Sequence, residues 1–327
     1  MIYDLIIIGT GAAGLSAGLY AGRYKMNTLI IGDPFGGETA KAGFIWNYPG
    51  AKDVDGYDLM RMMEAQAKDV GAEIIEGRVT KAEKEGHCFK IFVGSTGSPR
   101  VGDKEYSSKT LILTNGAERR RLGLSNEKEL GNKGVHYCVT CDGPVYGGKV
   151  VAMVGGGDAA VKGVNLLSQY AKKIYLLVRG KELRAEPVNQ EEMKSLGDKV
   201  EVFYETAVTE IVGKDKLEKI ILSKSSNGSS ELVIDGLFVE IGADPDREFS
   251  NSLKIETDER GYIVVDKEMK TNIDGIFAAG DATNFFGGFK QIVTAAAMGA
   301  VAATSAYQDA KMHGELCLFH SLPVVNT

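Results

Sequence analysis

The chain opens on a continuous apolar run that leads directly into closely spaced glycines. Residues 4–8 read Asp-Leu-Ile-Ile-Ile, and Gly9-Thr10-Gly11-Ala12-Ala13-Gly14 follows before a helical stretch that reaches Tyr24. A run without polar alternation is typical of a parallel strand that is buried on both faces. Glycines at such a strand-to-helix turn let the backbone approach a pyrophosphate at the helix N-terminus, where N–H groups and the helix dipole favour anions. The pattern predicts a dinucleotide-binding βαβ unit.

The same unit recurs in the middle of the chain. An apolar run over 149–154 is followed by Gly155-Gly156-Gly157-Asp158-Ala159-Ala160. Asp33 follows the second predicted strand of the first unit, and Arg179 holds the matching position in the second unit. A carboxylate there accepts the hydroxyls of a free ribose, whereas a guanidinium can hold a 2′-phosphate in bidentate fashion. The sequence therefore predicts two dinucleotide sites with different ribose chemistry.

A third segment indicates how the two units are joined. Residues 272–281 form a predicted short strand that ends in Gly280-Asp281, and an alanine-rich helix follows Lys290-Gln291 and reaches about Tyr307. Glycine and proline punctuate the chain near 115 and 244, where we expect it to cross between domains. We predict an α/β fold with two Rossmann-like, three-layer dinucleotide-binding domains. Residues 1–115 and 244–327 form the discontinuous first domain, and 116–243 form the second.

Composition narrows the functional classes. The 327 residues include 38 Lys and Arg against 44 Asp and Glu, a net charge of −6 that does not favour nucleic acid as a partner. No apolar stretch reaches the ~20 residues that a membrane span requires, so we expect no membrane association. The N-terminal segment lacks the basic region of a signal peptide, and we expect a cytoplasmic protein. Glycine is abundant at 41 residues, which indicates backbone held close to ligands.

The cysteines point to redox chemistry. Of four cysteines, only Cys138 and Cys141 are close, in Cys138-Val139-Thr140-Cys141-Asp142-Gly143. A C-x-x-C pair serves either metal binding or dithiol exchange. A zinc ribbon requires a second pair, whereas Cys88 and Cys317 stand alone, and the four histidines show no ligand spacing. Dithiol exchange is favoured, zinc is the weaker alternative, and we expect no metal.

With these motifs in order, the chain resembles the low-molecular-weight thioredoxin reductases, class II of the pyridine nucleotide-disulfide oxidoreductases. The matching segments are Gly9 to Gly14, Gly36-Gly37, Asn47-Tyr48-Pro49-Gly50, Cys138 to Gly143, Gly155 to Asp158, and Gly280-Asp281 with Gln291. The position of the cysteine pair shortly before the second glycine turn is the most specific of them. The resemblance covers nearly the whole chain.

The resemblance implies FAD in the first domain, NADPH in the second, a homodimer, and electron transfer through a Cys138–Cys141 disulfide to thioredoxin or a thioredoxin-like protein. It implies that Cys141 faces the flavin, that Cys138 exchanges with the partner, and that Asp142 acts as acid and base. The implied flavin-site residues are Gly9, Gly11, Ala12, Ala13, Gly14, Asp33, Gly36, Gly37, Glu38, Asn47, Val79, Gly116, Gly280, Asp281, Lys290, Gln291 and Ile292. The implied NADPH-site residues are Gly155, Gly157, Asp158, Ala159, Arg179 and Arg184.

The second site departs from the family pattern. Val178 and Gly180 replace the His and the second Arg of the family's His-Arg-Arg run, and Ala159 replaces a Ser or Thr that can bond phosphate. No acidic residue stands where a relative that uses NADH would place one, so NADPH is favoured. Two alternatives follow: the same disulfide reductase with ferredoxin, reduced flavin or NADH as donor, or a flavoprotein similar to ferredoxin–NADP reductase that lacks dithiol chemistry. The intact cysteine pair argues against the second.

Overall fold

The computed structural model describes residues 2–94, 104–226, 228–287 and 289–318, and the chain divides into two compact units. Unit 1 contains residues 1–118 and 244–327, and unit 2 contains residues 119–243. The first crossing thus falls at 118/119, close to the position at 115/116 that the glycines indicate. The crossing segments β9 (Ala117–Arg119) and β18 (Ala243–Pro245) pair as a two-stranded sheet. The predicted α/β fold with two Rossmann-like domains is confirmed.

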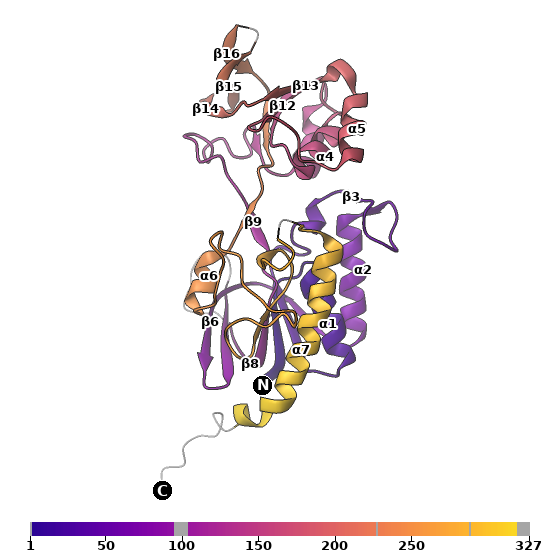
Figure 1. The fold of residues 1–327 in the computed structure, drawn as a ribbon, viewed down its shortest axis with the longest axis vertical. Coiled ribbons are helices and arrows are strands. Elements are labelled where there is room, and N and C mark those ends of the chain that lie inside the picture. Colours follow the sequence, from indigo (N-terminus) through magenta and orange to yellow (C-terminus); the bar gives the residue numbers. More distant parts are fainter. Residues whose placement is uncertain (1, 95–103, 227, 288, 319–327) are drawn as a thin grey trace. The chain divides into compact units, whose positions relative to one another are not determined.

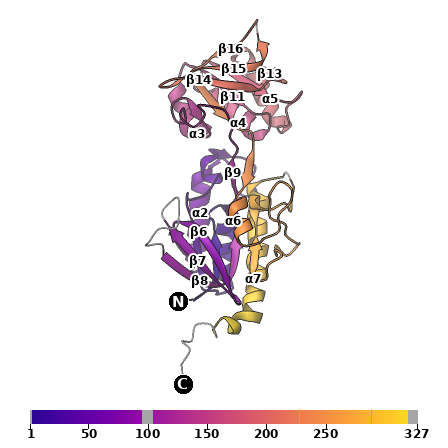
Figure 2. The same cartoon turned by 90° about the vertical axis from the view of Figure 1, so that its left-hand side faces the viewer.

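Unit 1 is built on a seven-stranded mixed sheet. The path of neighbours is β5-β2-β1-β8-β7-β6, and β19 pairs with β8. Strands β5, β2, β1, β8 and β19 are parallel, whereas β7 runs antiparallel to both of its neighbours, β6 and β8 (Figure 2). The sheet strands are β1 (Ile2–Ile8), β2 (Thr28–Gly32), β5 (Glu73–Glu76), β6 (Arg78–Glu85), β7 (Cys88–Gly94), β8 (Lys104–Leu113) and β19 (Ile276–Ala278). The other elements are α1 (Ala12–Arg23), η1 (Thr39–Lys41), β3 (Phe44–Ile45), β4 (Val54–Asp55), α2 (Gly56–Asp69), α6 (Arg247–Ser252), η4 (Gly280–Ala282) and α7 (Ile292–Leu318).

The unbroken apolar sequence of β1 is explained by two separate cores. Leu5 and Ile7 lie in the core beneath the helices, and Ile6 and Ile8 lie in the core on the opposite face. All four are at most 7% exposed, and fully burying one such side chain contributes about 1.5–3 kcal/mol. Because alternate residues of a strand point to opposite faces, a strand covered on both faces has no position left for a polar residue.

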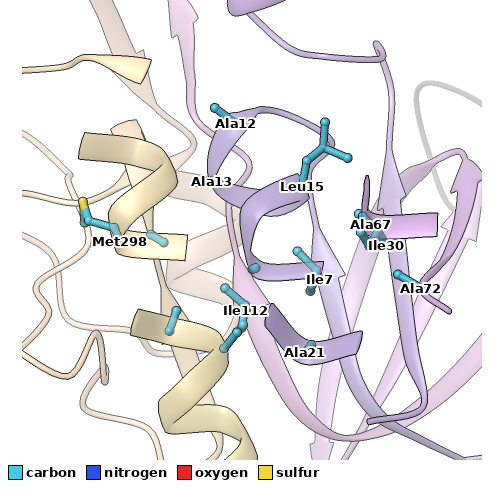
Figure 3. Close-up of a cluster of buried hydrophobic side chains, with 14 of the residues drawn as sticks. Ile7, Ala12, Ala13, Leu15, Ala21, Ile30, Ala67, Ala72, Ile112 and Met298 are labelled. Atoms are coloured by element: carbon cyan, nitrogen blue, oxygen red, sulfur yellow. The ribbon is translucent and has the colours of Figure 1, made fainter. Parts of the chain in front are cut away.

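Helices α1, α2 and α7 form one layer on the sheet of unit 1 (Figure 1). The close-up in Figure 3 shows Ala12, Ala13 and Leu15 of α1 together with Met298 of α7 and Ile112 of β8. Alpha-helices α1 and α7 approach so closely that a Cβ on Gly299 would lie 2.1 Å from the carbonyl oxygen of Ala13. This contact holds the start of α7 against the start of α1, where the first glycine turn lies.

Unit 2 repeats the strand-turn-helix plan on a five-stranded parallel sheet, in the order β10-β17-β11-β12-β13. Val151 and Met153 of β11 face one core, and Ala152 and Val154 face the other. The second core is closed by the antiparallel sheet β14-β15-β16. The strands of unit 2 are β10 (Val135–His136), β11 (Val150–Val154), β12 (Lys173–Val178), β13 (Val200–Tyr204), β14 (Val208–Gly213), β15 (Leu217–Ser226), β16 (Ser229–Val233) and β17 (Gly236–Val239). Its helices are α3 (Val139–Asp142), η2 (Gly143–Tyr146), α4 (Asp158–Leu167), α5 (Pro187–Ser195) and η3 (Gly197–Lys199).

Across the described ranges, no helix combines the length and the apolar character that a membrane crossing needs.

Candidate functional site

The first glycine turn joins β1 to α1 and leaves an open backbone surface. Gly9 has a φ of +120°, and a Cβ there would lie 2.3 Å from the carbonyl oxygen of Thr114, so this position must be glycine. A Cβ on Gly11 would meet nothing closer than the carbonyl oxygen of Gly36, at 4.0 Å. Gly11 caps α1 without a side-chain hydrogen bond. The first turn of α1 therefore presents its N–H groups beside empty space, as a pyrophosphate site requires.

Two further features of unit 1 suit a dinucleotide at this turn. Asp33 is exposed and follows β2 directly, at the carboxyl edge of the parallel strands where such ligands bind. Asn115 follows β8 at the same edge, and its Oδ1 atom is buried without a hydrogen-bond partner among the described residues. A buried carbonyl oxygen left unpaired costs free energy, so an external donor is expected there. These residues fit FAD as the ligand.

Residues that are far apart in sequence meet next to the start of α7. Asn47 donates from Nδ2 to Oε1 of Gln291 at 3.0 Å, which links the loop after β3 to the start of α7. Lys290 donates from Nζ to the carbonyl oxygen of Asp281 at 3.2 Å and to that of Thr283. The structure thus brings four of the predicted flavin-side residues into a network of two contacts that share the adjacent residues Lys290 and Gln291: Asn47 bonds Gln291, and Lys290 bonds the backbone of Asp281.

Burial shifts both charged members of this network toward their neutral forms. Burial raises the pKa of Asp281, and the nearby Lys290 charge opposes that shift. Burial likewise lowers the pKa of Lys290, and the Asp281 carboxylate opposes it. The Lys290 ammonium also lies 4.3 Å from the ring centroid of Tyr262, which helps to keep it charged in a partly dry setting.

The remaining predicted residues of unit 1 have definite places. Gly280 has a φ of +76° and sits against Ala13, so η4 lies over the start of α1. Val79 lies on β6 and packs partly buried on the second core of unit 1. The others are placed as follows: Ala12, Ala13 and Gly14 in the first turns of α1, Gly36 and Gly37 between β2 and η1, Glu38 at the start of η1, Gly116 between β8 and β9, and Ile292 as the first residue of α7.

The second glycine turn repeats the backbone of the first. Gly155 has a φ of +145°, and a Cβ there would lie 2.2 Å from the carbonyl oxygen of Glu240. Around Gly157, no atom of the described residues would lie within 4 Å of an added Cβ. Gly157 caps α4 without a side-chain hydrogen bond, and the exposed Ala159 follows in the first turn. This turn also offers N–H groups to an anion.

The side chains around the second glycine turn make different contacts from those around the first. Asp158 accepts from the backbone N–H of Glu186 at 2.6 Å and from Nδ2 of Asn189 at 3.0 Å, so its carboxylate holds the start of α5. The backbone N–H of Arg184 donates to the carbonyl oxygen of Gly156 at 2.7 Å. The guanidinium groups of Arg179 and Arg184 are exposed, and neither has an ion-pair partner in the part of the chain that the structure describes. Two available cations beside an open turn fit a phosphorylated dinucleotide.

The cysteine pair forms a disulfide at the start of α3. Cys138 and Cys141 are joined with a Cα–Cα distance of 5.3 Å, and Cys138 is the N-cap residue of the helix. The backbone N–H of Cys141 donates to Sγ of Cys138 at 3.2 Å. Such a donor stabilises a thiolate at Cys138 after reduction. Among the described residues, no group of three or more His, Cys, Asp or Glu side chains could hold a metal ion.

Behind the pair lies a buried polar group that the motif alone does not indicate. His136 ends β10 and is 5% exposed. Its Nδ1 atom lies 3.1 Å from Oδ2 of Asp142, and its Nε2 atom lies 2.6 Å from the hydroxyl of Tyr146. The Nδ1 contact has ion-pair distance without the alignment of a directed hydrogen bond. Proximity of His136 to the cysteines in sequence was the only available signal, and it does not reveal these contacts.

Two glycine turns on parallel sheets, each with the backbone form of a dinucleotide site, and a C-x-x-C disulfide point to the class of dinucleotide-dependent disulfide oxidoreductases. A family model described as pyridine nucleotide-disulphide oxidoreductase matches residues 3–299. The chain belongs to this family and is an enzyme of the oxidoreductase class.

Known proteins support the predicted resemblance. A thioredoxin reductase of Listeria innocua is 39% identical over 309 residues, which cover 93% of each chain. The structure of Lactococcus lactis thioredoxin reductase in its FR conformation has a TM-score of 0.87 and 34% identity, and it covers 95% of this chain and 99% of that one. A ferredoxin-flavin thioredoxin reductase of Clostridium acetobutylicum has a TM-score of 0.50 and 30% identity, with 95% and 98% covered. The similarity to thioredoxin reductases is confirmed.

Proposed function

We propose that this protein is a flavin-dependent thioredoxin-disulfide reductase that takes electrons from NADPH. The observation that carries the proposal is the Cys138–Cys141 disulfide, which stands at a helix start with Asp142 next to it. The same chain holds an open glycine turn in each unit. Relatives that match this chain over nearly their full length are named thioredoxin reductases.

FAD is the proposed cofactor of unit 1. The first turn of α1 would hold its pyrophosphate, Asp33 its ribose, and the network of Asn47, Lys290 and Gln291 its flavin side. When bound, FAD supplies the two-electron chemistry that connects a nicotinamide to a disulfide.

NADPH is the proposed ligand of unit 2, where Arg179 and Arg184 would hold the 2′-phosphate.

The residues of unit 2 perform the thiol chemistry. After reduction, the Cys138 thiolate attacks one sulfur of the thioredoxin disulfide, and the thiolate that leaves takes a proton from the Asp142 carboxyl group. Cys141 then returns its thiol proton to Asp142 and attacks Sγ of Cys138. This second attack releases the second thioredoxin sulfur as a thiolate, which is protonated by water, and it re-forms the Cys138–Cys141 disulfide.

The substitution Cys138→Ser tests the proposal. Thioredoxin-dependent reduction of insulin disulfide by NADPH should fall at least about 100-fold, because the attacking thiolate is gone. FAD should still bind, since Cys138 belongs to unit 2 and the glycine turn to unit 1. Thr140→Ser, an exposed change between the two cysteines, is the matched control and should retain turnover. Wild-type turnover by Cys138→Ser would refute the proposal.

Ferredoxin is the second candidate for the electron donor. The observation that favours it is the state of the second site, where the Asp158 carboxylate is engaged by its own chain and Gly180 adds no cation. A structural neighbour at 30% identity is named a ferredoxin-flavin thioredoxin reductase. Anaerobic reduction of the bound flavin by NADPH, NADH and reduced ferredoxin in parallel separates the donors. An NADPH rate no greater than the NADH rate would overturn NADPH as the donor.

A homodimer is also proposed. Helices α1, α2 and α7 of unit 1 surround a cavity of about 300 Å³, with the exposed Tyr20 and Val293 at its lining. Exposed apolar side chains around such a hollow suit contact with a second copy. Light scattering should give about twice the chain mass of 35.1 kDa, and a monomer at working concentration would refute the dimer.

A further inference from the structure

Next to the redox pair, His136 makes contacts on both sides of its ring. The ring is stacked on Phe238 at 5.2 Å between centroids, and it meets the Tyr146 ring edge-on at 5.4 Å. Tyr146 is fixed in turn, because its ring lies where a Cβ on Gly236 would be, 2.4 Å from Cε1. The imidazole therefore has little freedom to rotate, and its Nδ1 and Nε2 atoms stay close to the Asp142 carboxyl group and the Tyr146 hydroxyl.

We propose that His136 is a positioning residue of the dithiol reaction. Its ring lies between the Asp142 carboxyl group and the Tyr146 hydroxyl, with one nitrogen near each. It thereby holds Asp142 in place in both protonation states of that carboxyl group. The inference rests on the proposed function, since it assigns a role in the proton transfer by Asp142. Helix α3 of unit 2, which carries Asp142, is labelled in Figure 2.

The chemistry of a neutral imidazole makes this role possible. When Asp142 is ionised, Nδ1–H lies 3.1 Å from its carboxylate and donates to it once the two groups align, and Nε2 accepts from the Tyr146 hydroxyl. When Asp142 is protonated, its O–H donates to Nδ1, and Nε2–H donates to the Tyr146 oxygen. Asp142 thus has a hydrogen-bond partner before and after it gives a proton to the leaving thiolate. The ring changes tautomer and gains no net charge.

The charges around the ring agree with a neutral imidazole. Burial lowers the pKa of His136, and the Asp142 carboxylate opposes that shift. Burial, with the charges of Asp142 and Asp235, raises the pKa of Tyr146 to about 12, so its hydroxyl keeps its proton at neutral pH. The other charged group at this position is Lys149, whose ammonium lies 5.6 Å from the Tyr146 ring centroid. No described cation contacts His136 itself.

Two substitutions test the two ring nitrogens of His136 separately. In His136→Asn the amide nitrogen stands near the place of Nδ1 and can still donate to Asp142. In His136→Gln the amide reaches toward the place of Nε2 and Tyr146, and Asp142 loses its donor. Both side chains are polar and neutral, so a purely structural role predicts similar behaviour from the two variants.

The test measures dithiol exchange apart from the electron donor and from thioredoxin. The FAD-loaded protein is reduced with dithionite, freed of excess reductant, and mixed with a small aromatic disulfide between pH 5 and 9. His136→Gln should be about 10-fold slower at pH 7, a part of the 10²–10⁴-fold that a general acid–base group contributes. Its rate should also depend on pH differently from the wild-type rate, because the carboxylate of Asp142 has lost a donor. His136→Asn should keep the wild-type profile with a rate within about 3-fold.

A spectroscopic measurement reports the tautomer directly. The chain has four histidines, so ¹⁵N-histidine labelling gives few signals, and the His136 signal is the one missing in His136→Asn. At neutral pH the oxidised protein should show the Nδ1–H tautomer. An imidazolium, or an Nε2–H tautomer, would overturn the inference, as would equal pH profiles for the Asn and Gln variants.

If neither variant yields flavin-loaded protein, Tyr146→Phe takes their place. It should slow the exchange by about 3-fold and remove the preference for a single tautomer. No change in either the rate or the tautomer would overturn the inference.

The outcomes separate this inference from the proposed function. If reduced wild-type protein does not react with the disulfide, the proposed function fails. If wild-type protein reacts and the His136 variants behave alike, only the role of His136 is refuted.

Discussion

The two glycine turns follow the same backbone course but are surrounded by different side chains. In unit 1, segments from across the chain converge on the site, since Asn47 bonds Gln291 and Lys290 bonds the turn at Asp281. In unit 2, Asp158 instead anchors the start of α5, and the nearby arginines extend from the surface. Both turns require glycine for packing reasons, at Gly9 and at Gly155. A glycine motif is therefore evidence for the fold, whereas the ligand is decided by the side chains around it.

The largest expected effects come from adding a methyl group to the glycines that touch backbone. Gly9→Ala and Gly155→Ala should each lower the free energy of unfolding of their unit by about 2–4 kcal/mol, because a Cβ would collide with a carbonyl oxygen at positive φ. Hydrogen exchange followed by mass spectrometry reports each unit separately. Gly9→Ala should loosen unit 1 peptides alone, and Gly155→Ala unit 2 peptides alone.

Gly11→Ala and Gly157→Ala are the matched controls, because a Cβ there meets open space. Their stability should change by less than about 1 kcal/mol, whereas binding of the ligand in the same unit should weaken about 10-fold or more. Equal destabilisation by all four substitutions would refute the distinction between glycines that serve packing and glycines that serve a ligand.

The second prediction concerns the ribose chemistry of unit 2. Arg179→Gln should weaken NADPH binding about 10–100-fold, since a charge-assisted hydrogen bond to phosphate is lost, and should leave NADH binding within about 2-fold. Calorimetric titration of the flavin-loaded protein with each nucleotide measures both. A parallel loss for NADH would show that Arg179 contacts another part of the nucleotide.

Gly180→Arg is the complementary change. Its φ is not in the left-handed region, and a Cβ there would lie 3.6 Å from the nearest atom, so the position has room for a side chain. A third cation beside Arg179 should tighten NADPH binding about 3–10-fold without affecting NADH. If NADPH does not respond, this loop does not hold the 2′-phosphate, and ferredoxin gains support as the donor.

The sequence predicted what depends on local pattern. The apolar run of β1 and the glycines after it indicated a doubly buried strand and a turn, and the isolated cysteine pair favoured dithiol exchange over a zinc site. Contacts between distant segments were not predictable, because nothing in local composition couples them. Asn47 and Gln291 are 244 positions apart, and the carboxylate of Asp158 is turned toward α5 by a loop whose course follows from tertiary packing. His136 is the clearest case, because its function depends on Tyr146, ten positions away on another element. The assignment of each cofactor to its unit stays a prediction.

The smallest expected effect contrasts how the two units respond to acid. Burial lowers the pKa of His136 below its usual 6.5. At a pH between the lowered pKa of the folded unit and 6.5, the unfolded chain binds a proton that the folded unit does not. Unit 2 should therefore lose stability as the pH falls from about 7 to 5. Burial raises the pKa of Asp281 above its usual 3.8, so just above 3.8 the folded unit binds a proton that the unfolded chain does not. Unit 1 should therefore gain stability from Asp281 as the pH falls to about 4.

The measurement is exchange protection at pH 7, 5 and 4, corrected for intrinsic rates and made at equal flavin occupancy, in the wild type, His136→Asn and Asp281→Asn. Each substitution should remove the pH response of its own unit's residue and leave the other unit unchanged. If both substitutions changed the pH dependence of stability in the same direction, burial would not be the dominant cause of the pKa shift at one of the two positions. The contrast between the units would then fail at that residue.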